Sequence, residues 1–263
     1  MLRRWRKPVT VVIAPEGVVL NSGTIFAPEV DSKTAITSKP SSWLGVLAEL
    51  EKNAVKIGSE KIRFIVSNHY VRYAILPWRK DIFSQQDWQS LAENNLRALH
   101  GNVVDNWKLS VAMQGYGKPL VISAIDQLLF TQLEEVAKLH KWTIEAIEPA
   151  LMTALNHYRH KIKNNDWLLM TEPEHVLLAE SGNGSLVGFS SVRPPSGQEV
   201  AESLNLLRRA MKYRHKTETV QIHAFGNNKL LPEATVENMK FNRLSGNKIT
   251  GNLTCCSMLA ALS

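Results

Sequence analysis

The sequence predicts an α/β protein of two lobes, each built on a mixed sheet that helices flank on both faces. The chain has 263 residues, 44% of them apolar, which is enough for one large core or two smaller ones. Strand-sized apolar runs alternate with amphipathic helical segments. A hairpin of strands followed by alternating helices and strands occurs twice, and this order is typical of mixed sheets covered by helices.

Residues 1–163 are expected to form the first lobe. Its helices carry local start and stop signals, since Ser84 and Asp126 can cap helices and Gly101 follows one. Pro149 is expected in the first turn of another helix. We expect helices within 41–58, 84–101, 126–142 and 149–163, and strands at 9–13, 17–20, 61–67, 71–77, 106–113, 118–125 and 143–148.

The first lobe contains an extra strand, helix and strand at about 68–118, which we expect to form a small inserted α+β subdomain. Residues 164–263 are expected to form the second lobe, because the hairpin pattern begins again after Asn164. Tight turns at Pro173 and at 182–184 separate its first strands. We expect strands at 166–172, 174–181, 185–192, 219–226 and near 239–244, and helices at 198–214 and 253–263.

The formal net charge of +7 favours contact with something acidic, either nucleic acid or an anionic membrane surface. Near the N-terminus Arg3, Arg4 and Arg6 surround Trp5, and an indole among cations is typical of a membrane-proximal patch. The apolar run that follows is about five residues long, too short for a signal-peptide core. We therefore expect a cytoplasmic protein.

A large part of the chain resembles a known family. The run RFIVSNHYVRYAILPWRKDIFSQQDWQSLAENNLRALHG, then DNWKLSVAM and PLVISAIDQLLFTQLEEVAKLHKWTIEAIEPALMTAL, is similar to pilus-assembly proteins of the PilM and MshI types. It also resembles the L-type cytoplasmic domains of type II secretion. The shared features are Leu76-Pro77 at a strand end, a strand at 121–125, and Glu148-Pro149. The resemblance implies duplicated ribonuclease H-like lobes, the plan of the actin-like ATPases.

The resemblance also indicates where a nucleotide would bind. In actin-like ATPases two hairpin turns, one per lobe, carry an aspartate that helps to hold the metal ion. The first turn of this chain has Ala14 at that position, and Pro15 lacks an N–H that a phosphate would need. Glu16 would repel a phosphate unless a cation were bound. Gly17 is therefore the one residue of this turn that we retain as cofactor-binding.

The second and third turns are also altered. Thr171 stands where the second acid is expected, and Glu172-Pro173 follows it. We interpret Glu172, like the carboxylate of the first turn, as solvated. Gly226 and Asn227 match the Gly-Gly turn that packs on adenosine in the family. We therefore expect a pseudo-ATPase that has lost turnover and has no metal or other cofactor, with Gly226 and Asn227 as degenerate remnants of its adenosine turn; ATP binding is the less favoured alternative.

Two smaller groups of residues are candidates for a catalytic pair and for a contact surface. Ser67 and His69 are two apart near a strand, but no acid lies nearby in the sequence to orient the histidine, so we interpret them as structural. Trp78 beside Arg79 has the composition of an interface anchor. We therefore expect a contact with a partner or membrane at Trp78 and Arg79, together with the N-terminal patch.

The resemblance implies a non-catalytic cytoplasmic scaffold, peripheral at the inner membrane, in an assembly of the type IV pilus or type II secretion class. Its partner would be the short cytoplasmic tail of a single-pass membrane protein, bound as an extended peptide in a groove or on a sheet edge. The alternative is an active actin-like ATPase of the same machinery, and the altered turns argue against it. A nucleic-acid-binding protein ranks last, because the sequence has no recognisable nucleic-acid-binding motif.

Overall fold

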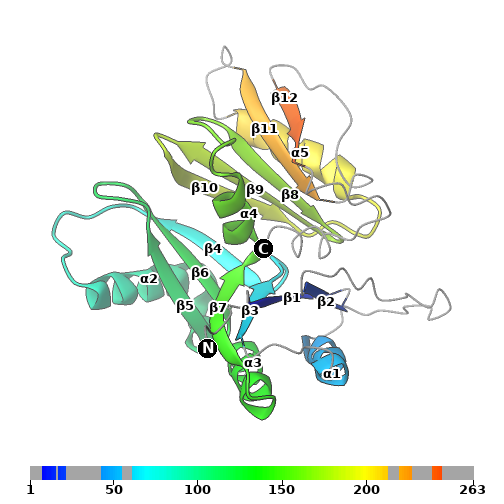
Figure 1. Cartoon of the computed structure of the whole chain (residues 1–263). Coiled ribbons are helices and arrows are strands. Elements are labelled where there is room, and N and C mark those ends of the chain that lie inside the picture. Colours follow the sequence, from blue (N-terminus) through cyan, green and yellow to red (C-terminus); the bar gives the residue numbers. More distant parts are fainter. Residues whose placement is uncertain are drawn as a thin grey trace, which may run out of the picture.

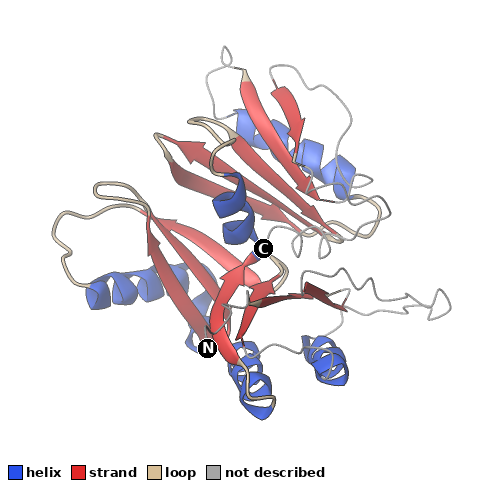
Figure 2. Cartoon of the chain, in the orientation of Figure 1, coloured by secondary structure: helices blue, strands red, loops and turns tan. Residues whose placement is uncertain are grey.

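The computed structural model describes residues 8–15, 17–21, 43–54, 61–212, 219–226 and 239–244. Three sheets organise this part of the chain, and helices cover their faces (Figures 1 and 2). Two sheets mix parallel and antiparallel pairs, whereas the third is antiparallel throughout. The prediction of an α/β protein with helix-flanked mixed sheets is therefore confirmed.

The first sheet joins the N-terminal hairpin to two parallel strands. Its strands are β1 (Val9–Ala14), β2 (Gly17–Asn21), β3 (Lys61–Val66) and β7 (Thr143–Pro149), and its covering helices are α1 (Trp43–Asn53) and α3 (Gln127–Leu139). Their order in the sheet is β2-β1-β3-β7. All six residues of β1 are buried, as expected for a strand covered on both faces. Phe64 of β3 packs with Leu50 of α1 and Leu133 of α3 in one apolar cluster.

The second sheet begins with a three-stranded meander. Its elements are β8 (Trp167–Glu172), β9 (His175–Gly182), β10 (Ser185–Val192), α5 (Glu199–Lys212), β11 (Val220–Gly226) and β12 (Met239–Arg243), with the strand order β10-β9-β8-β11-β12. Successive side chains of a strand point to opposite faces of its sheet. Trp167 and Leu169 of β8 therefore share a cluster with Leu207 of α5. Leu168 and Met170 belong to a cluster on the other face.

The third sheet is the small antiparallel one. It contains β4 (Val71–Leu76), β5 (Trp107–Met113) and β6 (Leu120–Asp126), and it packs with α2 (Gln85–His100) and the 3-10 helix η2 (Gly101–Asn106). Its central strand is β6, which lies outside the interval 68–118 that we proposed for the insertion. The expected caps are present, since the Ser84 hydroxyl accepts from Asp87 N at 3.0 Å and the Asp126 carboxylate accepts from Leu128 N at 2.7 Å. Gly101 ends α2 with a φ of 72°.

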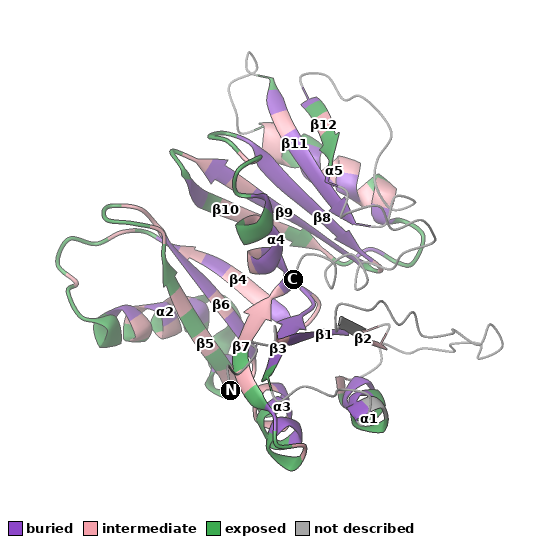
Figure 3. Ribbon diagram, viewed as in Figure 1, coloured by how far each residue is buried: buried purple, intermediate pink, exposed green. Residues whose placement is uncertain are grey.

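Helix α4 (Ala150–Tyr158) lies between the first and second sheets (Figure 1). Leu151 and Ala154 are fully buried in a cluster that also contains Val12 of the first sheet and Met170 of the second. The dense burial of β8, β9 and β11 around this helix is visible in Figure 3. One apolar core therefore joins the two lobes through α4.

Two helix predictions differ from the structure or lie outside it. The helix expected at 149–163 ends at Tyr158, and Pro149 precedes it as the N-cap residue. The chain turns there because Lys161 N and Ile162 N both donate to Tyr158 O, while Lys163 N donates to Asp166 Oδ2. The helix expected at 253–263 lies outside the described residues. Within the described part of the chain, none of the helices has the length and apolar content of a membrane span.

The core that α4 forms with both sheets can be tested by truncating one of its side chains. Leu151→Ala is expected to lower the free energy of unfolding by about 2–5 kcal/mol, because it leaves a cavity between the lobes. Leu139→Ala is the matched control, since that helical leucine is 70% exposed, and its effect is expected within about 0.5 kcal/mol. Urea unfolding followed by tryptophan fluorescence measures both. Equal losses would contradict a shared core around α4.

Candidate functional site

The first hairpin turn has no acidic side chain at the position expected for a metal ligand. Ala14 pairs with Gly17 across the turn, and its methyl group is 1% exposed within the cluster around α4. Gly17 has a φ of 134°, which L side chains rarely adopt, so the turn itself accounts for the glycine. Glu16 and the basic patch at 3–6 lie outside the described residues.

The second turn, between β8 and β9, contains a buried carboxylate. Glu172 is 2% exposed, so our interpretation of it as a solvated turn residue is wrong. It accepts hydrogen bonds from the Ser67 hydroxyl, from Asn68 Nδ2 at 2.5 Å and from Asn68 N at 3.3 Å. These donors belong to the loop that joins β3 to β4. The acid of the second lobe is therefore tied to the first lobe.

Asn68 connects this carboxylate to two further elements. Its Oδ1 accepts from the Tyr73 hydroxyl of β4 at 2.6 Å and from Leu151 N at the start of α4 at 3.1 Å. Burial, followed by the negative charge of Glu172, raises the pKa of Tyr73 well above its ordinary value. The phenol therefore stays protonated and donates. Ser67 N donates to Ile13 O at 2.9 Å, which fixes the loop to β1.

Ser67 and His69 do not form a nucleophile–base pair. The Ser67 hydroxyl donates to Glu172, whereas His69 Nε2 lies 2.6 Å from the carbonyl oxygen of Pro173 and donates to it. Burial lowers the pKa of His69 to about 4; the bond to Pro173 opposes this shift, and the charges of Arg193 and Arg72 add to it. A neutral His69 therefore serves as a second link between the lobes.

Gly226, at the end of β11, is required by packing. It pairs with Thr171 in the parallel ladder, and its φ is 152°. A Cβ atom at this position would lie 2.3 Å from Thr171 O, closer than any van der Waals contact allows. The close approach of the two strands therefore explains the glycine without a nucleotide. Asn227 lies outside the described residues, and the adenosine turn stays a prediction.

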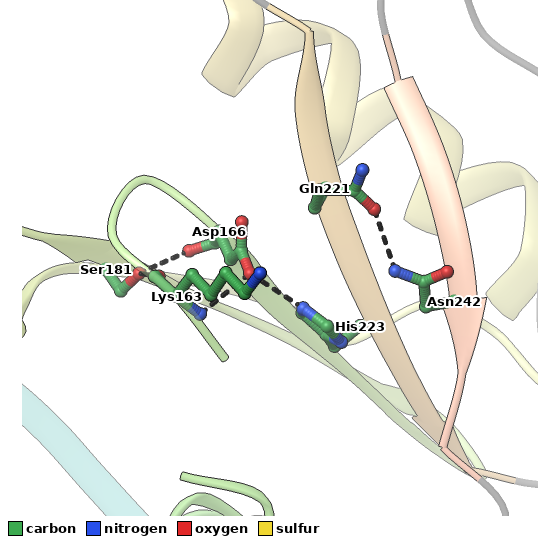
Figure 4. A network of polar contacts seen from close by, with 6 residues as sticks. All are labelled: Lys163, Asp166, Ser181, Gln221, His223 and Asn242. Carbon is green, nitrogen blue, oxygen red and sulfur yellow. Dashed lines mark hydrogen bonds and ion pairs between the residues drawn. The ribbon is translucent and has the colours of Figure 1, made fainter. Parts of the chain in front are cut away.

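A second polar network lies at the start of β8, the opposite end of that strand from Glu172 (Figure 4). Asp166 Oδ2 is 2.9 Å from His223 Nε2 and accepts from Lys163 N at 2.8 Å. The Ser181 hydroxyl lies 2.7 Å from Asp166 O and 2.8 Å from Lys163 O. Although serine, aspartate and histidine meet here, the hydroxyl faces carbonyl oxygens and has no base beside it. The network closes the loop between α4 and β8.

The lobes also meet at the third sheet. Gln114, after β5, makes two hydrogen bonds with Leu186 of β10. Leu186 N donates to Gln114 Oε1 at 2.6 Å, and Gln114 Nε2 donates to Leu186 O at 2.9 Å. Lys118 Nζ donates to Gly184 O at 3.0 Å. The third sheet is therefore fixed to the β9–β10 turn as well as to the turn that contains Glu172.

The predicted interface residues Trp78 and Arg79 lie outside these contacts. Trp78 is half-buried, with its ring centroid 5.4 Å from that of Trp88 and 5.2 Å from that of Tyr116. Arg79 is exposed and pairs with Asp81 at 2.6 Å. Part of the Trp78 surface is therefore used within the chain, and a partner contact at these residues stays a prediction.

A groove lies between β5 and β7, which are next to each other in Figure 1. The sequence did not predict it. The volume of the groove is about 490 Å³. Both strands are the outermost strands of their sheets in the described part of the chain. No signal in the sequence could place them next to each other, because they belong to different sheets. The residues lining the groove are Val66, Lys108, Leu109, Ser110, Ser123, Ile125, Phe130, Glu134, Ile144, Ile147, Glu148 and Pro149.

The described residues contain no group of three or more histidine, cysteine, aspartate or glutamate side chains placed to hold a metal ion. Each of the three turns expected around a nucleotide is already occupied by contacts within the chain. The first has the buried methyl group of Ala14, the second has the Glu172 carboxylate with three hydrogen bonds, and the third has Gly226 packed against the backbone of Thr171. In this arrangement the turn that contains Glu172 joins the lobes.

No protein-family model and no curated protein matches the sequence. Solved structures are similar in fold. The cytoplasmic domain of EpsL, an inner membrane component of the type II secretion system of Vibrio cholerae, aligns with a TM-score of 0.58 and 11% identity over 97% of this chain and 93% of that one. A Bacteroides thetaiotaomicron protein with an actin-like ATPase fold and unknown function aligns with a TM-score of 0.55 and 13% identity, covering 84% and 82%.

The chain has the actin-like ATPase fold. This confirms the fold that the sequence resemblance implied. The PilM–PilN type IV pilus biogenesis complex is more distant, with a TM-score of 0.49 and 11% identity over 82% of this chain and 77% of that one. The division of this actin-like chain at residues 163 and 164 stays a proposal.

The buried carboxylate can be tested by an exchange that keeps its shape. Glu172→Gln removes the charge and turns one acceptor into an NH₂ donor facing Ser67 or Asn68. We expect the free energy of unfolding to fall by about 1.5–3 kcal/mol, the range for hydrogen bonds to a charged group. Urea unfolding measures it, and Glu174→Gln, the same exchange at an exposed position, is expected to change little. Equal stability of the two variants would contradict the assigned role of Glu172.

Proposed function

We propose that this chain is a non-catalytic actin-like scaffold at the cytoplasmic face of the inner membrane. It would dock the cytoplasmic tail of a single-pass membrane protein in an assembly of the type II secretion or type IV pilus class. The single observation that carries the docking role is the groove between β5 and β7. The similarity in fold to the cytoplasmic domain of EpsL supports the choice of machinery.

The groove suits an extended peptide because the edge strands β5 and β7 both line it, together with residues of β6 and α3. β5 ends the order β4-β6-β5, and β7 ends the order β2-β1-β3-β7. An edge strand presents backbone N–H and C=O groups that a further strand can bond. β5 also alternates between half-buried and exposed residues along most of its length, so side chains of an added strand would find matching positions.

The groove is mainly apolar and has charged residues along it. Lys108 Nζ lies 5.4 Å from the ring centre of Phe130, which links β5 to α3. Glu134 of α3 and Glu148 of β7 also line the groove and are acidic. A tail with apolar residues at alternate positions and a nearby cation would fit this lining. The apolar lining residues are Val66, Leu109, Ile125, Phe130, Ile144, Ile147 and Pro149.

The basic segment at residues 3–6 supports a position near an anionic leaflet, because clustered cations are attracted to its surface. In this arrangement the scaffold binds a membrane-anchored tail at the groove and the lipid headgroups at its N-terminus. Both contacts involve only the cytoplasmic side of the membrane.

Loss of ATPase activity is supported by the turns themselves. Ala14 cannot coordinate Mg²⁺ through its side chain, and Pro15 has no N–H for a phosphate oxygen. Glu172 holds the lobes together through donors on the first lobe. Opening the turns to admit Mg-ATP would therefore leave a buried carboxylate without its donors, which is unfavourable.

Nucleotide turnover is tested by incubating the purified chain with Mg-ATP. We expect no phosphate release above that of buffer and no saturable binding that adenosine displaces, since the turns lack a metal ligand at Ala14 and a donor at Pro15. Isothermal titration calorimetry and a phosphate-release assay measure the two quantities. Micromolar binding that adenosine displaces, together with phosphate release, would replace the scaffold proposal with an active ATPase.

Docking in the groove is tested with a labelled synthetic peptide, the cytoplasmic tail of a single-span membrane protein encoded beside this chain. Leu109→Asp places a charge in the groove, and Ser110→Arg, at an exposed position, adds bulk there. Each is expected to raise the Kd by about tenfold or more, as for loss of an interface anchor. Fluorescence anisotropy measures the Kd.

The control for this experiment is Leu44→Asp, which introduces the same charge at a leucine of α1 that is 57% exposed. Its Kd is expected to equal that of the unaltered chain. Equal binding by Leu109→Asp and Leu44→Asp would locate the tail elsewhere, and absence of binding by the unaltered chain would overturn the docking role.

A further inference from the structure

A second pocket lies where the third sheet meets the second lobe. It has a volume of about 280 Å³ and is lined by residues of β4, β9 and β10 together with His100 at the end of α2. Strands β4 and β10 face each other there (Figure 1). Of its lining residues, His175 borders the second turn, where it pairs with Glu172, and none lines the groove between β5 and β7. It is therefore a separate feature of the fold.

Two guanidinium groups from opposite lobes meet at this pocket. Arg72 Nη1 donates to His69 O at 3.3 Å and to Val71 O at 3.2 Å, and Arg193 Nη2 donates to the same His69 O at 3.0 Å. Across the described residues, no ion pair joins either group to a carboxylate. The shared carbonyl thus holds two positive charges close together without a counter-charge.

Burial and the nearby positive charges lower the pKa values of two groups at this pocket. Burial, followed by the charge of Arg193, lowers the pKa of Arg72 below its ordinary value. Burial also lowers the pKa of His175 to about 3, and the neighbouring His69, Arg193 and Arg72 add to the shift. Bringing two guanidinium groups together is unfavourable unless something negative lies between them.

His175 supplies a third observation that points to a ligand. Its side chain is 5% exposed and lines the pocket, yet its Nδ1 has no hydrogen-bond partner among the described residues. A buried polar nitrogen without a partner is unfavourable, and such atoms usually meet a protein group, a water or a ligand. The neutral imidazole can donate one hydrogen bond or accept one. The Ser191 hydroxyl also lines the pocket.

From these contacts we infer that the pocket binds a small phosphate dianion, held by Arg72 of the first lobe and Arg193 of the second. Two guanidinium groups match the charge of a phosphate monoester, and their planar forks match pairs of phosphate oxygens. A volume of 280 Å³ lies at the lower end of small-molecule pockets, which suits inorganic phosphate or a short monoester. The bound anion bridges the lobes and stabilises the contacts between them.

The inference is tested by titrating the full chain with inorganic phosphate in a low-salt buffer at neutral pH, followed by isothermal titration calorimetry. One saturable site is expected. Arg72→Gln and Arg193→Gln are each expected to weaken binding by about tenfold or more, because each removes charge-assisted hydrogen bonds. Arg208→Gln removes the same charge from an exposed position of α5 that lies outside both pockets, and it is expected to bind phosphate as the unaltered chain does.

Further arms identify the source of the phosphate and guard against misfolding. Binding of glycerol 3-phosphate would indicate a soluble monoester as the ligand, and binding of vesicles that contain phosphatidic acid would indicate a lipid headgroup. Tight binding of either probe that depends on Arg72 or Arg193 supports the site. Arg193 is exposed, so its variant keeps the test valid should Arg72→Gln fail to fold. Absence of saturable binding up to about 10 mM, or equal binding by the Arg193 and Arg208 variants, would overturn the inference.

Discussion

The two lobes of this chain are joined by a buried carboxylate, which lies beside the apolar core around α4. Glu172 accepts from Ser67 and Asn68, and Asn68 in turn accepts from Tyr73 and from the first turn of α4. A buried charge is tolerated only when its hydrogen bonds are made. The loop between β3 and β4 must therefore stay against the β8–β9 turn, and α4 must stay between the sheets.

This constraint links the fold to its proposed role. The resemblance implied a metal-holding aspartate in each of two hairpin turns, whereas here one turn has a buried methyl group at Ala14 and the other binds the opposite lobe. Gln114 and Lys118 add hydrogen bonds between the third-sheet region and the second lobe. The same structure contains the groove between β5 and β7 and the pocket lined by Arg72 and Arg193.

The helix ends could be predicted from the sequence because the interactions that form them are local. Ser84 and Asp126 cap helices as predicted, and Gly101 ends α2, because each signal acts within one helical turn. The prediction was wrong at Glu172, whose donors lie 104 and 105 residues away in the chain. A turn glutamate is usually solvated, and nothing in its own segment indicated that another lobe would cover it.

The sequence by itself determined the order of strands and helices, the doubled lobe, and the absence of an acid at Ala14, because periodicity, capping residues and side-chain chemistry are properties of short segments. The tertiary structure alone decided which strands became sheet edges, where β5 meets β7, and which lobe supplies the partners of Glu172 and Arg193. These features join segments far apart in the chain. Their energies arise from burial and hydrogen bonding after the lobes have met, and no short segment encodes them.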